Sequence, residues 1–130
     1  MKSVTTLVVL LTVLLSVQTG LQAQSSNYKN INEYSLESLK KGIQSDNPGL
    51  RRSAIYMAGL YKIDEVVETL VDQLDKEKIP SNRVLIALSL YNIGNPEGME
   101  AVKDLAARDK DKEVKRMGTV LYRQFADINN

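Results

Sequence analysis

Apolar residues recur at three- and four-residue steps along most of this chain, which is the spacing of one face of an α-helix. The pattern is plain where Leu50, Ala54, Met57 and Tyr61 follow one another, and no stretch alternates as a strand does. The spacing therefore predicts an all-helical domain. The six expected helices cover residues 35–45, 48–62, 65–75, 80–93, 96–108 and 112–126.

Start and stop signals agree with these ranges. Asn47 and Asn95 each precede a proline, a residue that suits the first helical position because its missing N–H has no partner there. Gly94 is placed to end a helix in the left-handed conformation that glycine tolerates. The other expected caps are Ser35, Asp64 and Asp111.

Leucine–tyrosine pairs reveal an internal repeat. They occur at nearly equal intervals, at Leu60-Tyr61, Leu90-Tyr91 and Leu121-Tyr122. A repeat of this kind predicts stacked helix pairs, with each helix packing on its neighbours. The pairs are interpreted as core residues rather than as an aromatic ligand platform. The segment 80–93 is apolar around nearly its whole circumference, so we expect it at the centre of the stack.

Three segments resemble bacterial HEAT-like repeats. Residues 46–54, DNPGLRRSA, are similar to the start of the first helix of such a repeat. Residues 93–97, IGNPE, resemble the turn between helices, and residues 112–116, KEVKR, resemble a third helix start. Residues 79–83, IPSNR, depart from the pattern because they lack its aspartate, valine and paired arginines. The resemblance implies a short right-handed solenoid, with two full repeats and terminal half-repeats.

The chain begins with a different kind of segment. Lys2 precedes an apolar run over residues 4–17, and mostly small and polar residues follow as far as Ala23. These are the parts of a secretory signal peptide over residues 1–23, which predicts a secreted or periplasmic protein with no stable membrane anchor after cleavage. An uncleaved anchor and a buried first helix are the alternatives. Beyond it we expect a flexible lead-in over 24–34, the domain over 35–126 and a tail over 127–130.

Composition narrows the chemistry. The 17 basic and 16 acidic residues nearly balance, so the chain lacks the excess cations that nucleic-acid binding needs. It contains no cysteine and no histidine, which removes thiol nucleophiles, the commonest general base and the commonest zinc ligand. We therefore predict that the protein is not an enzyme and that it has no catalytic residue, cofactor or metal site.

Two charged clusters can each be interpreted either as a ligand site or as ordinary surface structure. Acids alternate through residues 109–113, DKDKE, as in a calcium loop, but the turn glycine and the distant glutamate are missing, so a turn with a helix cap is favoured. A basic stripe could serve an anionic partner, although pairing with nearby acids is favoured. Its members are Arg51, Arg52, Lys115 and Arg116.

The function expected of such a fold is protein binding. We predict a scaffold module of the bacterial envelope or extracellular space, with a mainly acidic surface on the second helix of each pair that suits a basic protein or peptide segment. The predicted partner-binding residues are Glu68, Asp72, Glu100, Lys103 and Asp104.

Two other functions stay open. Some bacterial HEAT-like proteins resemble bilin lyases, which implies a small-molecule accessory role, although one phenylalanine and no tryptophan offer little for a large aromatic ligand. Self-association through the last helix is the other, because no further helix follows to cover its apolar residues. These are Met117, Val120, Leu121 and Phe125.

Overall fold

The computed structural model describes residues 32–129, and every regular element in this part of the chain is helical. The α-helices are α2 (Glu33–Ile43), α3 (Pro48–Leu60), α4 (Val67–Lys76), α5 (Pro80–Ile93), α6 (Pro96–Arg108) and α7 (Lys112–Asn129). A short 3-10 helix, η1 (Asp64–Val66), leads directly into α4. The prediction of an all-α fold with six helices is confirmed.

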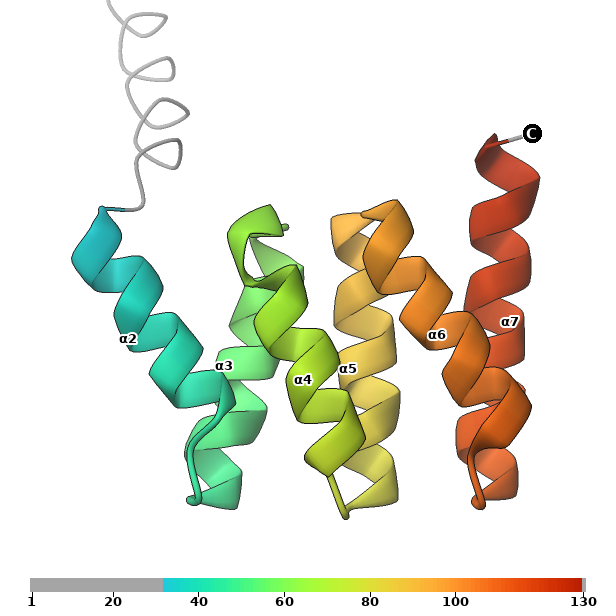
Figure 1. Cartoon of the computed structure of the whole chain (residues 1–130), viewed down its shortest axis with the longest axis horizontal. Helices are drawn as coiled ribbons and strands as arrows, with labels where there is room; N and C mark the ends of the chain where they lie inside the picture. The colour runs from blue at the N-terminus through green and yellow to red at the C-terminus, as the bar shows by residue number, and fades with distance from the viewer. Residues whose placement is uncertain (1–31, 130) are drawn as a thin grey trace, which may run out of the picture. The chain divides into compact units, whose positions relative to one another are not determined.

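The helices form two layers, as in a short solenoid (Figure 1). We call α3, α5 and α7 the first layer, and α2, α4 and α6 the second layer, which lies toward the viewer in Figure 1. Along the chain, α3 is followed by α4 and α5 by α6, so these are the two complete helix pairs. The second-layer helix α2 and the first-layer helix α7 are the half-repeats at either end.

Equivalent helices start at equal intervals, since the first-layer helices begin at Pro48, Pro80 and Lys112. The interval from Pro48 to Pro80 is one structural repeat, and the repeat inferred from the leucine–tyrosine pairs is slightly shorter than this. Leu90 and Leu121 are buried, but Leu60 is 51 % exposed. The prediction of a core role is wrong for the first pair, and no two of the three pairs occupy the same place in the structural repeat.

Local capping explains where several helices begin and end. The side-chain oxygen of Asn47 accepts hydrogen bonds from the first N–H groups of α3, and Asn95 does the same for α6. Asp111 caps α7, since its Oδ1 accepts from the backbone N–H of Glu113 at 2.9 Å. Gly94 ends α5 at a φ of 78°, where a side chain would be strained. These four predicted caps are confirmed.

Two predicted caps are wrong. α2 already begins at Glu33, which places Ser35 inside the helix rather than before it. Asp64 is the first residue of η1, and its carboxylate accepts a hydrogen bond from Asn95 Nδ2 at 2.9 Å instead of capping its own helix. Asp64 thus links the start of one second-layer element to the start of the next.

The core is centred on α5, as its apolar circumference predicts. This helix packs against both neighbours in its own layer, α3 and α7, and against α4 and α6 of the second layer. Ile86 and Leu90 have no exposed surface. Leu88 remains 37 % exposed on the outer side of the first layer. Ser81 and Asn92 are exposed on the same face, so the four helices leave one stripe of α5 in contact with solvent.

The ends of the helical unit differ from the predicted boundaries. α7 continues through Asn129, so most of the predicted tail over 127–130 is helical. The predicted signal peptide over 1–23 and most of the lead-in lie outside the described residues. Within residues 32–129, no helix combines the length and the apolar character needed to cross a membrane.

The last helix hides the apolar residues on which self-association was predicted. Leu121 is only 4 % exposed, and Phe125 packs against the central core. Met117 is half-buried, which leaves Val120 as the one member of the set that is exposed. The expected apolar face of α7 is therefore not available, because α5 and α6 already cover most of it.

Candidate functional site

An open groove of about 630 Å³ runs between α4 and α6 in the second layer. Its floor is aliphatic. Val71 and Leu74 come from α4, and Ala101 and Leu105 from α6. These side chains belong to the core or pack against it, and one side of each still faces the groove. We call this feature the α4/α6 groove.

Carboxylates stand on both walls of the groove. Asp75 lines it from α4 and Asp104 from α6. Asp104 accepts a hydrogen bond from Arg108 at 3.2 Å, but both side chains are mostly exposed, so this ion pair is weak. Asp75 forms no ion pair or hydrogen bond with any other described residue. The lining also includes three cations: Arg83, which pairs with Asp109, Arg108, which pairs with Asp104, and the exposed Lys110. Asp75 is thus the lining carboxylate that has no cation partner among the described residues.

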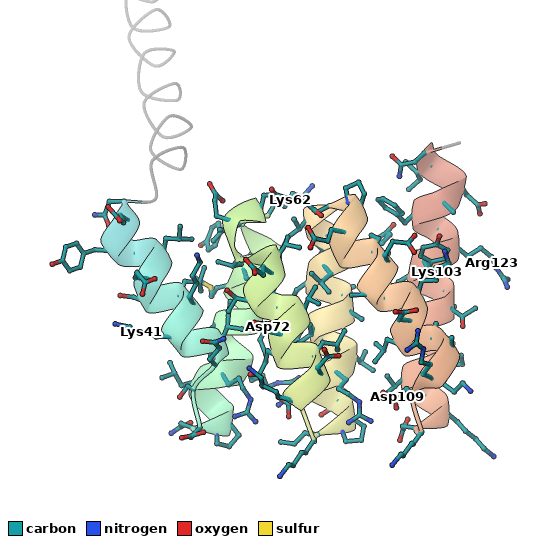
Figure 2. The ribbon with its side chains drawn as sticks, viewed as in Figure 1. Lys41, Lys62, Asp72, Lys103, Asp109 and Arg123 are labelled. Atoms are coloured by element: carbon teal, nitrogen blue, oxygen red, sulfur yellow. The ribbon has the colours of Figure 1, made fainter. Side chains whose placement is uncertain are left out.

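A row of carboxylates extends from the groove along the outer side of α4 and back to η1. Its members are three or four residues apart, which places them on one helical face. All are exposed, and within residues 32–129 none is paired with a cation. Figure 2 labels Asp72 in the middle of this row. The α4 carboxylate row consists of Glu65, Glu68, Asp72 and Asp75.

The structure separates the five predicted binding residues into two groups, although all five are exposed. Glu68 and Asp72 belong to the α4 carboxylate row, and Asp104 lines the groove opposite. Glu100 and Lys103 are turned toward α7 instead. The prediction missed Asp75 and the apolar floor; the spacing of three residues after Asp72 was the available signal for Asp75.

Glu100 and Lys103 form a small cluster with an α7 tyrosine. Lys103 Nζ lies 3.1 Å from Glu100 Oε2 and 5.3 Å from the centroid of the Tyr122 ring. Tyr122 donates a hydrogen bond from its hydroxyl to Glu100 at 3.3 Å. The hydrogen bond to Glu100 raises the pKa of Lys103. These contacts join α6 to α7, so Glu100 is not a free carboxylate of the groove.

At the foot of the stack, two buried ion pairs each join the first turn of a first-layer helix to the segment that follows its paired second-layer helix. Arg51 Nε lies 2.7 Å from Glu77 Oε2, and Arg83 Nε lies 2.7 Å from Asp109 Oδ2. The carboxylate side chains are only 1 % and 6 % exposed. Each arginine also donates to a backbone carbonyl six residues before it, that of Ser45 or of Glu77. The two pairs are one structural repeat apart, and we call them the arginine ladder.

Hydrogen bonding keeps the ladder carboxylates ionised. Burial disfavours the charged form of Glu77, but hydrogen bonds from Arg51 and from the backbone of Ile79 outweigh it, so its pKa is lowered. The hydrogen bond from Arg83 is the main reason why the pKa of Asp109 is also lowered. Groups with these pKa directions hold structure together at neutral pH and are unsuited to proton transfer.

Hydrogen bonds and ion pairs engage most residues of the two charged clusters. Three of the four residues of the predicted basic stripe have partners: Arg51 in the ladder, Arg52 with Asn82 at 2.9 Å, and Arg116 with Glu113. At the suspected calcium loop, Asp109 pairs with Arg83 and Asp111 caps α7. Among the described residues, no three acidic side chains converge to hold a metal ion.

Comparison with known proteins agrees with this architecture. The family model for HEAT repeats matches residues 36–120, which covers most of the described stack. The chain belongs to the HEAT repeat family. HEAT repeats commonly serve as protein-interaction scaffolds and are generally non-catalytic. Neither a curated protein sequence nor a solved structure gives a significant match to this HEAT-repeat chain.

Proposed function

We propose that this HEAT-repeat protein is a non-catalytic binding module that holds a basic segment of a partner protein in the α4/α6 groove. The observation that carries the proposal is an aliphatic floor between walls that each present a carboxylate, Asp75 and Asp104. A segment with an aliphatic residue beside a lysine or arginine has the matching chemistry. Its apolar side chain would cover the floor while its cation pairs with the walls.

The α4 carboxylate row adds a longer-range attraction. Four unpaired carboxylates on one face of η1 and α4 create a negative field beside the groove. Such a field speeds the approach of a positively charged segment more than it tightens the final complex. Binding in this groove should therefore weaken as salt is added, since exposed charges are screened over about 8 Å at physiological ionic strength.

Family membership and composition support the non-catalytic part of the proposal. HEAT repeats are generally non-catalytic, and the chain has no histidine and no cysteine. The pigment-binding alternative gains nothing from the groove, because no aromatic side chain is among the described residues that line it. A flat conjugated ligand would have no ring to stack on there.

The location of this module is also a proposal. The basic start and the apolar run over residues 4–17 support export to the periplasm or beyond a bacterial cell, with cleavage after Ala23. Expression of the full chain in a bacterium, fractionation and N-terminal sequencing would test this. Recovery of an intact Met1 terminus in the cytoplasm would contradict it.

Selection from a random peptide library on the full chain tests the binding proposal. The expected result is enrichment of sequences that place lysine or arginine next to an aliphatic residue. For a selected peptide, fluorescence anisotropy should show at least about a tenfold loss of affinity when Asp75→Lys and Asp104→Lys are combined, which corresponds to about 1.4 kcal/mol. The double variant Glu68→Lys/Asp72→Lys should slow association.

A matched control comes from the same helix. Glu100→Lys makes the same change of charge on α6, but on the side that contacts Tyr122, and it should leave peptide affinity almost unchanged. Thermal unfolding of all variants would verify that the helices are intact. An unchanged affinity of the Asp75→Lys/Asp104→Lys protein for every selected peptide would contradict the proposed surface.

A further inference from the structure

The first layer exposes an apolar edge at its N-terminal end. On α3 and just after it, Leu50 is 55 % exposed, Met57 is 40 % exposed and Tyr61 is 47 % exposed. The spacing of seven and then four residues places these side chains on one face of the helix. We call these three residues the α3 apolar edge.

The same positions are covered in the later repeats. A shift by one structural repeat takes Met57 to Ser89 in α5, whose hydroxyl donates to the backbone carbonyl of Ile55 in α3 at 2.9 Å. This face of a first-layer helix thus packs on the first-layer helix before it. The positions equivalent to Leu50 and Met57 are all buried: Asn82 and Ser89 in α5, and Val114 and Leu121 in α7. The α3 apolar edge therefore has the form of a surface made to receive another helix.

The opposite end of the stack has a different character. The face of α3 that contacts α5 includes Ile55 and Gly59, and the equivalent positions in α7 are Thr119 and Arg123. Both α7 residues are exposed, and Figure 2 shows Arg123 directed away from the stack. A polar outer face is typical of a terminal repeat that meets water. Head-to-tail stacking of copies would bury this cation against the α3 apolar edge, which is unfavourable.

At the same end of the stack, α2 carries an exposed acidic side chain and an exposed basic side chain, and such a pair can form ion pairs with a second copy of the same surface. On α2, Glu37 and Lys41 are both exposed, one turn apart, and Figure 2 shows Lys41 projecting from this end of the stack. Within residues 32–129 neither forms an ion pair. A two-fold arrangement can bring Glu37 of one copy toward Lys41 of the other, twice. The arginines of α3 itself, Arg51 and Arg52, are already held by Glu77 and Asn82.

We propose that two copies of this chain pair about a two-fold axis through the α2–α3 end, with α3 of one copy packed against α3 of the other. The contact buries the α3 apolar edge on both sides and leaves the charged end at α7 in solvent. It uses a different surface from the α4/α6 groove, so the dimer carries two open grooves. A ligand with two basic segments would then gain avidity from binding both.

Cysteine cross-linking tests this pairing cleanly, because the chain has no cysteine of its own. In the full chain, oxidation of Met57→Cys should give a covalent dimer on a non-reducing gel, since a two-fold contact brings Met57 near its own copy. Val120→Cys on α7 is the control, because the native residues are equally exposed at 40 %. It should cross-link at least about tenfold more slowly. Equal cross-linking of the two variants would overturn the proposal.

Sedimentation of the unmodified full chain supplies an independent readout. The expected result is a concentration-dependent dimer whose dissociation constant rises at least about tenfold in Met57→Lys and is unchanged in Val120→Lys. A monomer at all concentrations would overturn the proposal. If the Met57→Cys thiol of that monomer also resists alkylation, the residues that precede α2 cover the edge instead of a second copy.

Discussion

Each arginine of the ladder forms hydrogen bonds with two successive loops of the stack, one before its own helix and one after the next helix. Arg83, in the first turn of α5, binds the backbone carbonyl of Glu77 before its helix and the carboxylate of Asp109 after the next helix. The contact spans 26 residues along the chain. Because Asp109 has almost no contact with water, removal of its cation would leave a buried and unpaired charge, which is costly.

Replacement of this arginine should therefore reduce stability markedly. Arg83→Met keeps much of the side-chain length but removes the guanidinium, and we expect the free energy of unfolding to fall by about 3 kcal/mol. Urea denaturation followed by circular dichroism measures the loss. Arg108→Met is the control, since its ion pair with Asp104 is mostly exposed and should contribute less than about 1 kcal/mol. Similar losses in both variants would show that the ladder is not a special support.

Local caps were predictable from sequence, and the ladder was not. Asn47 and Asn95 act on the next two or three residues, so the short pattern Asn-Pro contains all the information. Glu77 looks like any other surface acid in the sequence, and only the packing of α4 against its neighbours buries it. The recurrence of Arg51 and Glu77 as Arg83 and Asp109 becomes visible once the register of the structural repeat is known.

The approach of α3 to α5 depends on one glycine. A Cβ at Gly59 would lie 2.7 Å from the Cα of Ser89, so the two backbones are closer than any side chain there permits. Glycine normally weakens a helix interior by up to about 1 kcal/mol relative to alanine. Its presence in α3 is explained by the neighbouring helix and not by the helix in which it stands.

The substitution Gly59→Ala has two opposite effects on stability: it raises the helix propensity of α3, and it disturbs the packing of α3 against α5. We expect packing to dominate, with a loss of about 1–3 kcal/mol in the free energy of unfolding, because backbone atoms of α5 cannot move aside cheaply. Gly49→Ala, in the exposed first turn of α3, is a suitable comparison; its nearest contact is the Asn47 side chain at 3.3 Å. That variant should change stability by less than about 1 kcal/mol. Thermal unfolding distinguishes them, and a more stable Gly59→Ala protein would contradict the argument.

The sequence predicted the ranges of the helices more accurately than it predicted the register of the repeat. The predicted ranges 80–93 and 96–108 match α5 and α6 because proline, asparagine and glycine mark their ends. The register inferred from leucine–tyrosine pairs was wrong because identical residues can occupy different positions around a helix. Leu60 and Leu90 are each followed by tyrosine in the sequence but face solvent and core respectively.

Stability across the stack should decrease from the centre to the ends. In a solenoid each helix contacts only its neighbours, so the helix with the most neighbours opens least often. α5 contacts four other helices, whereas α2 and α7 have neighbours on one side only in their own layers.

Hydrogen exchange followed by mass spectrometry would measure this gradient. Amides around Ile86 and Leu90 should exchange most slowly, at the rate of global unfolding. Those of α2 and of α7 after Phe125 should exchange fastest. Equal protection along residues 33–129 would instead indicate a single cooperative unit without fraying ends.

The sequence by itself determined the helices, their caps, the alternation of two layers and the central place of α5, because these follow from local spacing and from the apolar circumference of one segment. Only the tertiary structure decided which acids are buried and which are free. It placed Glu77 and Asp109 in the arginine ladder, left Asp75 unpaired on the groove, and turned Glu100 toward α7. It also showed that, within residues 32–129, Leu50 and Met57 of α3 are exposed while Leu121 of α7 is buried. The reason is that burial depends on the distance and direction of neighbouring helices, which no single helical pattern contains.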